Sequence, residues 1–445
     1  MTGSIYKAYD IRGIYPTELN EDIAYRVGRA LVLFLDKTNP RVAVGRDARL
    51  SSPALAEALI RGITDQGGTV IDIGLAATPT LYFAVAHHGY DAGVEVTASH
   101  NPKEYNGLKI VRERAISIGL ENGLVQIREI AERNKFPPTV HGGIIHTDLT
   151  REHVEHDMKF AGKVDGFTIA ADPANAMGVL YIEELFHHVP GNLVRMNFKL
   201  DGTFPAHQAD PLQDETLADL KKKVVESGAD LGIATDGDGD RIFFIDEKGE
   251  TVPQPIIRGV MAQMFLRRFP GATICYDIRP GKITHEMIVA GGGVPVKTRV
   301  GHTFIKQKMR ETGAVFAGES SGHFFTNING ACYETPTIVI LKLLEWMTEQ
   351  KKPLSELVAQ YKKYWNSGEI NFVVQEKDAA IQKITEHFAG ATVDLLDGLT
   401  IETNDFWFNL RKSNTEPLLR LNLEAVNKEI GEEKVREINS ILGLS

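Results

Sequence analysis

The sequence predicts an α/β protein made of successive strand-and-helix blocks, followed by a smaller α+β unit. Apolar runs rich in β-branched residues alternate with helix-like stretches over most of the chain. The chain has 445 residues. One domain averages about 150 residues, so a single small domain is excluded. From about residue 368 the alternation gives way to a strand-rich meander, which predicts the change of class.

The first block contains predicted strands and one clear helix. The strands are the apolar runs at 41–47, 69–75 and 94–98. Residues 53–67 place leucine and isoleucine four positions apart after two serines, which predicts a helix. Two prolines and a glycine pair within 135–143 break both periodicities. We therefore place a domain boundary there.

The strand-and-helix pattern then restarts twice, so three successive blocks are expected to share a related architecture. Their predicted strands are the apolar runs within 167–173, 230–250, 272–278, 294–301 and 314–325. Helices predicted over 335–350 and 352–365 close the third block. Helical segments at 377–389 and 429–442 flank the final meander, as in an α+β unit.

Composition narrows the possible partners and the compartment. Lys and Arg number 49 against 59 Asp and Glu, a net charge of −10 that disfavours binding to nucleic acid or an anionic membrane. Cys275 and Cys332 are too few for a disulfide framework. The N-terminus lacks an apolar signal core, and no apolar run is long enough to span a bilayer. A cytoplasmic protein is expected.

Polar motifs follow several of the apolar runs, where open α/β sheets place their ligand crevices. The first is TASHNP at 97–102. Ser99 on such a turn is a candidate nucleophile, with His100 near enough to orient a phosphoryl oxygen. An ordinary Asn-Pro turn explains the same letters, so this loop alone decides nothing.

The second motif, DGDGDR at 236–241, carries carboxylates at alternate positions. Its glycines let the backbone fold Asp236, Asp238 and Asp240 around one hard cation. Three protein carboxylates leave positions for water and a phosphoryl oxygen, which suits Mg²⁺. Without a cation they would repel each other, which argues against a solvated acidic turn. Arg241 beside them suits an anion that approaches the metal.

The same spacing also matches the start of an EF-hand calcium loop, with Glu247 at its twelfth position. Two observations argue against that interpretation. Arg241 stands at the sixth position, where the calcium loop needs glycine, and the segment continues into an apolar strand-like run instead of a helix.

The third motif is GESSGH at 318–323, after another apolar run. Glu319, Ser320 and Ser321 supply acceptors and hydroxyls that suit a polyol. A plain Ser-Gly turn is the alternative. His323 could transfer a proton, because its ordinary pKa lies near neutrality, although a lone histidine is more often structural.

The fourth motif is RKSNTEP at 411–417. Its arginine can bind phosphate bidentately, and the next polar residues add hydroxyl, amide and backbone donors in a short arc. A polar hairpin between two strands is the competing interpretation. Near the N-terminus, KAYDIRG supplies Tyr9 and Arg12, and YNGLKIV supplies Lys109. Each of these alone is indistinguishable from surface charge.

The order of these motifs along the chain (KAYDIRG, TASHNP, DGDGDR, GESSGH, RKSNTEP) resembles the α-D-phosphohexomutase superfamily, and within it the phosphomannomutase/phosphoglucomutase subgroup. The resemblance covers essentially the whole chain. It implies three mixed α/β domains of shared topology and a C-terminal domain of the TATA-binding-protein-like type around a central cleft. The implied domains are 1–138 with the phosphoserine loop, 139–248 with the metal loop, 249–366 with the sugar-binding loop and 367–445 with the phosphate-binding loop.

Matched motif by motif, the resemblance also implies residue roles. Ser99 would be the phosphoserine, and an oxygen of it would bind one Mg²⁺ together with Asp236, Asp238 and Asp240. Glu319 and Ser321 would contact sugar hydroxyls. Arg411, Ser413, Asn414 and Thr415 would hold the phosphate that is not transferred. The same cleft would be lined by Tyr9, Arg12, His100, Lys109, Arg241, Arg279, His302 and His323. Arg279 stands where some relatives carry lysine, which puts its role in doubt.

The activity implied is reversible phosphoryl transfer between C1 and C6 of a hexose phosphate, through phosphorylated Ser99 and a 1,6-bisphosphate that also serves as activator. Lys109 and His323 are the candidates for moving the hydroxyl proton, since Arg12 has too high a pKa to act as a base. Mannose phosphate is the first expectation for the substrate, glucose phosphate the second and glucosamine phosphate an alternative. The expected protein is a monomer or homodimer.

Two interpretations from other classes stay open on sequence alone. One is a Mg²⁺-dependent phosphatase or nucleotidyl enzyme that uses the DGDGDR acids without Ser99. The other is a sugar-phosphate or Ca²⁺-binding module without catalysis. A binder needs only an anion site, whereas this sequence carries both a metal loop and a nucleophile loop.

Overall fold

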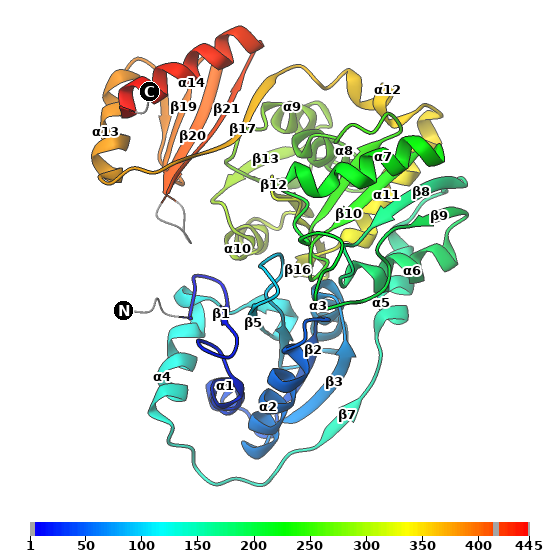
Figure 1. Cartoon of the computed structure of the whole chain (residues 1–445), viewed down its shortest axis with the longest axis vertical. Coiled ribbons are helices and arrows are strands. Elements are labelled where there is room, and N and C mark those ends of the chain that lie inside the picture. Colours follow the sequence, from blue (N-terminus) through cyan, green and yellow to red (C-terminus); the bar gives the residue numbers. More distant parts are fainter. Residues whose placement is uncertain (1–4, 413–417, 444–445) are drawn as a thin grey trace. The chain divides into compact units, whose positions relative to one another are not determined.

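The computed structural model describes residues 5–412 and 418–443 (Figure 1). Their contacts divide the chain into two compact units, and each unit draws on two stretches of chain. Unit 1 comprises Met1–Val252 and Ser321–Ser355, and unit 2 comprises Pro253–Ser320 and Glu356–Ser445.

The first sheet of unit 1 has the strand order β1-β5-β4-β2-β3-β7, with β6 beside β5. Its strands are β1 (Ile11–Ile14), β2 (Arg41–Arg46), β3 (Thr69–Leu75), β4 (Ala92–Val96), β5 (Tyr105–Arg112), β6 (Ile116–Ser117) and β7 (Ile144–His146). β2 runs parallel to both β3 and β4, so the carboxyl ends of these strands meet at one edge of the sheet. That edge receives the serine loop after β4.

Four α-helices accompany this sheet: α1 (Glu21–Leu35), α2 (Ser52–Asp65), α3 (Thr78–His88) and α4 (Val125–Arg133). α1 begins after Asn20, whose side chain accepts a hydrogen bond from the amide of Ile23 and so caps the helix. α2 starts with a Ser-Pro pair, and proline suits the first turn because its missing N–H would be unpaired there. Buried aliphatic residues of α1, α2 and β2 form one shared core.

The second sheet of unit 1 has the order β11-β10-β8-β9. Its strands are β8 (Phe167–Asp172), β9 (Gly191–Arg195), β10 (Leu231–Thr235) and β11 (Ile242–Asp246), and its helices are α5 (Thr150–Asp157), α6 (Gly178–His188) and α7 (Ala218–Ser227). β10 is buried along its whole length and pairs antiparallel with β11. The short connection between these two strands is the acidic loop. Unit 1 also contains the hairpin of β15 (Phe324–Ile328) and β16 (Ala331–Glu334), followed by α11 (Pro336–Gln350).

Unit 2 contains a parallel group and an antiparallel sheet. In the parallel group β12 (Thr273–Asp277) lies between β13 (Val294–Thr298) and β14 (Phe316–Gly318), with α8 (Gln254–Arg268), α9 (Lys282–Ala290) and α10 (His302–Thr312). The antiparallel sheet has the order β17-β21-β20-β19-β18. Its elements are β17 (Trp365–Phe372), β18 (Thr392–Asp394), β19 (Leu399–Glu402), β20 (Phe406–Lys412), β21 (Leu419–Ala425), α13 (Lys377–His387) and α14 (Lys428–Leu442). The α13 and α14 helices lie along this sheet (Figure 1).

Most predicted elements are confirmed, including the strands at 41–47, 69–75 and 94–98 and the helix over 335–350. The helix predicted over 352–365 is wrong in its second half. α12 covers only Leu354–Ala359, and Trp365 already begins β17, which pairs with β21. The cross-strand partner of Trp365 is 60 residues away in sequence, so local periodicity could not reveal it. β7 lies after the predicted boundary at 138 and pairs with β3. Among the described residues, no helix is both long and apolar enough to cross a membrane.

Candidate active site

Ser99 lies on the turn that follows β4, and its backbone has a left-handed conformation, with φ of 49°. Serine rarely adopts this conformation, and such backbone strain is typical of functional sites. The amide of Ser99 donates to Oγ1 of Thr97 over 2.9 Å, and Ser99 is only 3% exposed. The turn thus fixes the hydroxyl in one place at the carboxyl edge of the first sheet.

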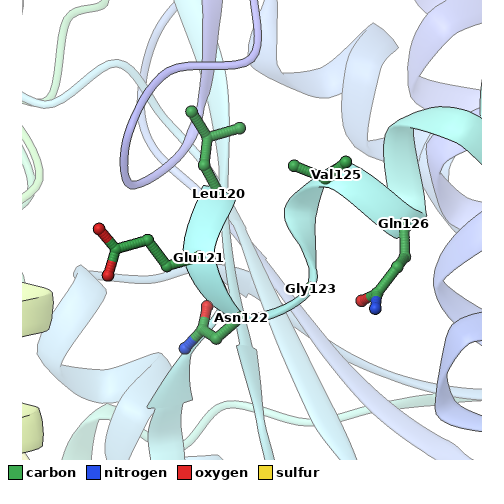
Figure 2. Close-up of a pocket in the computed structure, with 6 residues that line it drawn as sticks. All are labelled: Leu120, Glu121, Asn122, Gly123, Val125 and Gln126. Atoms are coloured by element: carbon green, nitrogen blue, oxygen red, sulfur yellow. The ribbon is translucent and has the colours of Figure 1, made fainter.

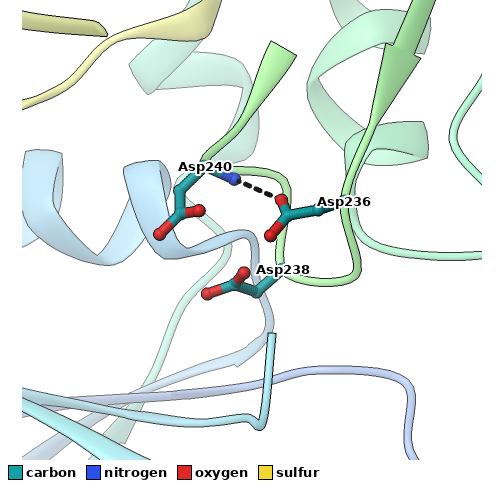
Figure 3. Close-up of side chains that lie close together, drawn as sticks. All are labelled: Asp236, Asp238 and Asp240. Atoms are coloured by element: carbon teal, nitrogen blue, oxygen red, sulfur yellow. Dashed lines mark hydrogen bonds between the residues drawn. The ribbon is translucent and has the colours of Figure 1, made fainter. Parts of the chain in front are cut away.

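The acidic loop between β10 and β11 folds back on itself. The amides of Asp240 and Arg241 donate to Oδ1 of Asp236 over 3.1 and 3.2 Å. Figure 3 shows the three aspartates converging, with the Asp240 bond dashed. Gly239 has φ of 72°, a conformation that favours glycine. All three carboxylates are at least 98% buried.

The two loops meet although they come from different sheets. Oγ of Ser99 donates a hydrogen bond to Oδ2 of Asp236 over 2.7 Å. Their approach depends on Gly237, because a Cβ at that position would lie 2.2 Å from the carbonyl oxygen of Ser99. The sequence predicted a nucleophile loop and a metal loop separately, and the structure places them in contact.

Lys109, from β5, completes this cluster. Its Nζ donates to Oδ2 of Asp238 over 2.5 Å and to Oδ2 of Asp240 over 2.6 Å. Burial alone lowers the pKa of a lysine, but here the carboxylates of Asp238 and Asp240 outweigh burial and raise the pKa of Lys109 well above its ordinary value. Lys109 is therefore a fixed positive charge in the arrangement described.

The pKa values of Asp236 and Asp240 are shifted in opposite directions. Burial, followed by the charges of Asp240 and Asp238, raises the pKa of Asp236. Burial also disfavours ionisation of Asp240, but Lys109 and His323 outweigh it and hold the pKa of Asp240 well below its ordinary value. Close carboxylates that cannot all ionise easily are expected where a cation normally supplies the missing charge.

These residues fit a divalent metal ion. One ligand oxygen from each of Asp236, Asp238 and Asp240 lies within 4.8 Å of the others. Oδ1 of Asp238 is buried and has no hydrogen-bond partner among the described residues. Carboxylate oxygens are the donors that hard cations such as Mg²⁺ prefer. The aspartate cluster could therefore bind a metal ion.

Two histidines border the cluster. Nδ1 of His100 lies 3.2 Å from Oγ of Ser99. Burial, then the charges of Arg241 and Arg12, lower the pKa of His100 well below its ordinary value, so this ring is neutral at pH 7. Nε2 of His323 lies 3.2 Å from Oδ1 of Asp240, and its Nδ1 lies 2.9 Å from Oγ of Ser321. Ser321 therefore lies in unit 1, where its hydroxyl contacts His323.

Two arginines lie beside the cluster. Arg12, on β1, donates from Nη1 to Oδ1 of Asn101 over 2.5 Å, directly in the serine loop. Nε of Arg241 lies 3.7 Å from Oδ2 of Asp236. Tyr9 lies half-buried in the bend before β1.

Unit 2 carries the other predicted site residues. Oε1 of Glu319, directly after β14, accepts from the amide of Gly301 over 2.7 Å, next to His302 at the start of α10. Nε of Arg279 donates to Oδ2 of Asp277 over 2.5 Å. Burial opposes the charge of Arg279, but Asp277 and then Glu319 outweigh it and raise the pKa of Arg279.

Arg411 differs from the prediction in its location. It lies within β20 instead of in the following loop, is 4% exposed, and its Nη2 is 3.5 Å from Oε2 of Glu369 on β17. Burial, then the positive charge of Arg279, lowers the pKa of Arg411. Two arginines that repel each other in this way are typical of an anion site. The predicted residues Ser413, Asn414 and Thr415 lie outside the described residues.

Three buried groups at these loops escaped the sequence analysis. Thr78, at the start of α3, donates from its amide to the carbonyl oxygen of Asp238 over 3.0 Å and from its hydroxyl to the Asp238 carboxylate. Tyr181 donates to the carbonyl oxygen of Gly239 over 3.1 Å. Arg49 binds the backbone of the serine loop. The sequence did contain a signal for Arg49, because Asp47 ends the strand predicted at 41–47 and Arg49 follows it, as the recognised motifs follow their strands.

A cavity of about 320 Å³ lies elsewhere in unit 1. It is formed by the π-helical turn before α4 and is lined by Leu120, Glu121, Asn122, Gly123, Val125 and Gln126 (Figure 2). None of these residues contributes a carboxylate, hydroxyl or histidine to the cluster around Ser99. This cavity is therefore not part of the candidate active site.

Comparison with known proteins identifies the family to which each part of the chain belongs. Sequence profiles of the phosphoglucomutase/phosphomannomutase α/β/α domains I, II and III match residues 3–138, 151–249 and 256–364, and the profile of the C-terminal domain matches 369–440. These matches confirm the predicted fold class of three mixed α/β domains and a C-terminal domain with an antiparallel sheet.

Individual relatives match over nearly the full length. A phosphomannomutase of Methanocaldococcus jannaschii is 39% identical over 98% of this chain and 97% of its own. A phosphomannomutase of Salmonella typhimurium is 39% identical over 94% of each chain. A crystal structure of a phosphoglucomutase/phosphomannomutase family protein from Burkholderia thailandensis is 30% identical, covers 99% of this chain and 97% of its own, and has a TM-score of 0.89. The chain therefore belongs to the phosphoglucomutase/phosphomannomutase family and is an isomerase of the phosphohexomutase class.

Proposed function

We propose that this protein moves a phosphoryl group reversibly between C1 and C6 of a hexose phosphate, with mannose phosphate as the preferred substrate. Ser99 would carry the phosphoryl group. The observation that carries this proposal is the 2.7 Å hydrogen bond from Oγ of Ser99 to Asp236, which joins a strained, buried hydroxyl to an aspartate cluster. Phosphoryl transfer depends mostly on positioning and charge neutralisation, and this cluster provides both.

In the first step, the free hydroxyl of a hexose 1-phosphate or 6-phosphate attacks the phosphorus on Ser99. A new P–O bond to the sugar forms, the bond from phosphorus to Oγ breaks, and the sugar hydroxyl gives up its proton. The product is a hexose 1,6-bisphosphate. After the bisphosphate turns over, Oγ of Ser99 attacks the other phosphate, and the proton returns to the released sugar oxygen. The net result is isomerisation with Ser99 phosphorylated again.

The proton would pass to His323 and not to Lys109. The raised pKa of Lys109 keeps its ammonium charged, so it neutralises developing negative charge instead of accepting a proton. His100 would orient Oγ of Ser99, since its Nδ1 lies 3.2 Å away. Arg12, Tyr9 and Arg241 would help to attract the phosphorylated substrate.

Asp236, Asp238, Asp240 and an oxygen of phosphorylated Ser99 would hold one Mg²⁺ ion. When bound, this ion neutralises phosphoryl charge and polarises the transferred group. A hexose 1,6-bisphosphate would act as activator by phosphorylating Ser99 when the phosphate has been lost.

Further residues would bind the rest of the substrate. Glu319 and Ser321 would contact sugar hydroxyls, and Arg279 and His302 would bind the same sugar phosphate. Arg411, with Ser413, Asn414 and Thr415, would hold the phosphate that stays on the sugar. A guanidinium recognises phosphate regardless of the carbon that bears it, which both halves of the reaction require. The proposed partner is a small sugar phosphate, and the proposed assembly is a monomer or homodimer.

The test compares wild-type protein with Ser99→Ala and the milder Ser99→Thr. Isomerisation of mannose 1-phosphate, glucose 1-phosphate and glucosamine 1-phosphate is measured with Mg²⁺ and glucose 1,6-bisphosphate, and intact mass reports one added phosphate. We expect wild-type protein to be phosphorylated and to act fastest on mannose 1-phosphate. Ser99→Ala should lose both the added phosphate and the isomerase activity. A Ser99→Ala variant that keeps hydrolysing the sugar phosphates would identify a phosphatase, and faster conversion of glucosamine 1-phosphate would make glucosamine the substrate.

A further inference from the structure

Arg49 is a buried residue of unit 1 that the proposed reaction does not use. It lies between β2 and α2, and it is 1% exposed. Burying a guanidinium is costly unless each of its donors is paired. The identity of its partners therefore indicates why the charge is there.

Arg49 has five side-chain N–H donors, and each has an acceptor within the protein. Nε donates to Oδ2 of Asp47 over 3.0 Å. Nη1 donates to the carbonyl oxygens of Pro102 and Tyr105 over 2.7 and 3.0 Å. Nη2 donates to the carbonyl oxygens of Ser99 and Asn101, both over 2.7 Å. Three of the five acceptors are thus backbone carbonyls of the serine loop, and a fourth is the carbonyl of Tyr105 at the start of β5. No donor of Arg49 is left for a ligand.

These bonds supply hydrogen-bond donors to carbonyl groups of the serine loop. With φ of 49° at Ser99, the chain leaves the strand ladder sharply, so its carbonyl groups cannot be paired by a neighbouring strand. A strained residue persists only where the surrounding structure over-determines its conformation. One planar guanidinium that binds the carbonyls on both sides of His100 supplies that constraint.

A second segment holds Arg49 in this orientation. The ring of Phe204 covers the guanidinium at 5.0 Å. Gly202 forms a parallel β-bridge with Arg49, and a Cβ at position 202 would lie 2.1 Å from the carbonyl oxygen of Ala48. Beyond this contact, Nε2 of Gln208 donates to the carbonyl oxygen of His100 over 2.9 Å. The segment around 202–208 therefore fastens the same loop from the other side.

We infer that Arg49 is a positioning residue for phosphoryl transfer: it holds the strained serine loop so that Oγ of Ser99 stays in line with its phosphoryl donor and acceptor. Lysine cannot replace it, because an ammonium is a point donor without the planar fork. The inference rests on the proposed function, because it assumes that Ser99 carries the phosphoryl group.

The experiment compares Arg49→Lys and Arg49→Ala with wild-type protein. Glucose 1,6-bisphosphate and Mg²⁺ are added to dephosphorylated protein, and intact mass follows phosphorylation of Ser99 with time. We expect Arg49→Lys to slow both phosphorylation and kcat by about 100-fold, as small misplacements of reacting groups do. KM for the sugar phosphate should change less than about threefold, because Arg49 donates nothing to a ligand. Guanidinium ion added to Arg49→Ala should restore part of the phosphorylation rate.

Two further variants keep the test decisive. Arg29→Lys is the matched control, because Arg29 also stacks on an aromatic ring, Phe136 at 4.4 Å, but hydrogen-bonds Gln66 instead of the serine loop. It should react at the wild-type rate. Gly202→Ala keeps the arginine at position 49 but should displace it, so it should slow phosphorylation as Arg49→Lys does. This variant therefore tests the inference if the Arg49 variants fail to fold.

The outcomes separate the two claims. Wild-type protein that never gains a phosphate on Ser99 overturns the proposed function. Wild-type protein that is phosphorylated at the same rate as Arg49→Lys and Gly202→Ala overturns the positioning role alone. An equal loss of rate in Arg29→Lys would also overturn it, since any buried or stacked arginine would then have the same effect.

Discussion

Ser99 and Asp236 are 137 residues apart in sequence, yet the hydroxyl of one donates directly to the carboxylate of the other over 2.7 Å. The contact joins the carboxyl edges of two different sheets. It also explains why neither loop could be interpreted alone, since the nucleophile and the acids become one chemical group only where these edges meet.

The glycine between the first two aspartates should be essential for this contact. A Cβ at Gly237 would lie 2.2 Å from the carbonyl oxygen of Ser99, so Gly237→Ala should push the two loops apart. We expect kcat to fall by about 100-fold, measured by coupled isomerase assay, because the reacting groups are displaced. Gly143→Ala is the control, since a Cβ at that exposed glycine meets nothing within 4 Å. Equal activity of both variants would contradict the close approach.

The aspartates should account for metal binding. Asp238→Asn removes one of three convergent carboxylates and should weaken Mg²⁺ binding by about tenfold or more, as measured by calorimetry, because hard cations prefer charged oxygen ligands. Chelation of divalent ions should abolish isomerisation. Asp214→Asn changes an exposed aspartate paired with Lys221 and should leave binding unchanged. Unaltered Mg²⁺ affinity in Asp238→Asn would place the metal elsewhere.

Lys109 should compete with a metal ion for the same carboxylates. Lys109→Met removes the ammonium from Asp238 and Asp240 and leaves their charges uncompensated in metal-free protein. We expect a lower melting temperature without Mg²⁺ and a larger rise on adding Mg²⁺ than in wild-type protein. Differential scanning calorimetry in both conditions measures this difference. An identical rise in the two proteins would show that Lys109 and the ion do not share ligands.

Arg411 should contribute equally to both directions of the reaction. Arg411→Lys loses the bidentate fork and should raise KM for the 1-phosphate and the 6-phosphate by a similar factor, about tenfold. Steady-state kinetics in both directions measure the two values. Lys412→Ala, at the exposed neighbour that pairs with Asp378, is the control. A change confined to one direction would mean that Arg411 distinguishes the two ends of the sugar.

His207 should make stability depend on pH. A hydrogen bond to Asp172 raises the pKa of His207, although burial opposes it. The stabilisation is therefore fully present below the unfolded pKa of about 6.5 and is lost as pH rises through the higher folded pKa. Urea unfolding should show that His207→Gln destabilises the protein more at pH 6 than at pH 9. An equal destabilisation by His207→Gln at the two pH values would contradict the assignment.

Local sequence patterns predicted where helices and strands form better than they predicted which segments contact each other. Strands such as 69–75 and the helix over 335–350 follow from periodicity, which depends on neighbouring residues. Trp365 begins a strand because of a partner in β21, and Arg411 lies inside β20 for a similar reason, so neither could be read from its neighbours. The left-handed backbone of Ser99 and the four bonds of Arg49 to backbone carbonyls also depend on distant segments. The sequence motifs identified the candidate reacting groups. The residues that hold those groups in position could be identified only from the tertiary structure.

The division of the chain into two units also determines whether the fragments separate after a protease cuts the chain. The chain passes from one unit to the other at 252–253, at 320–321 and at 355–356. A cut at the first passage leaves residues 321–355 on the C-terminal fragment, although they pack with the N-terminal one. Nicked protein should therefore migrate as one particle until denatured, and neither unit can be produced as a single uninterrupted piece of polypeptide.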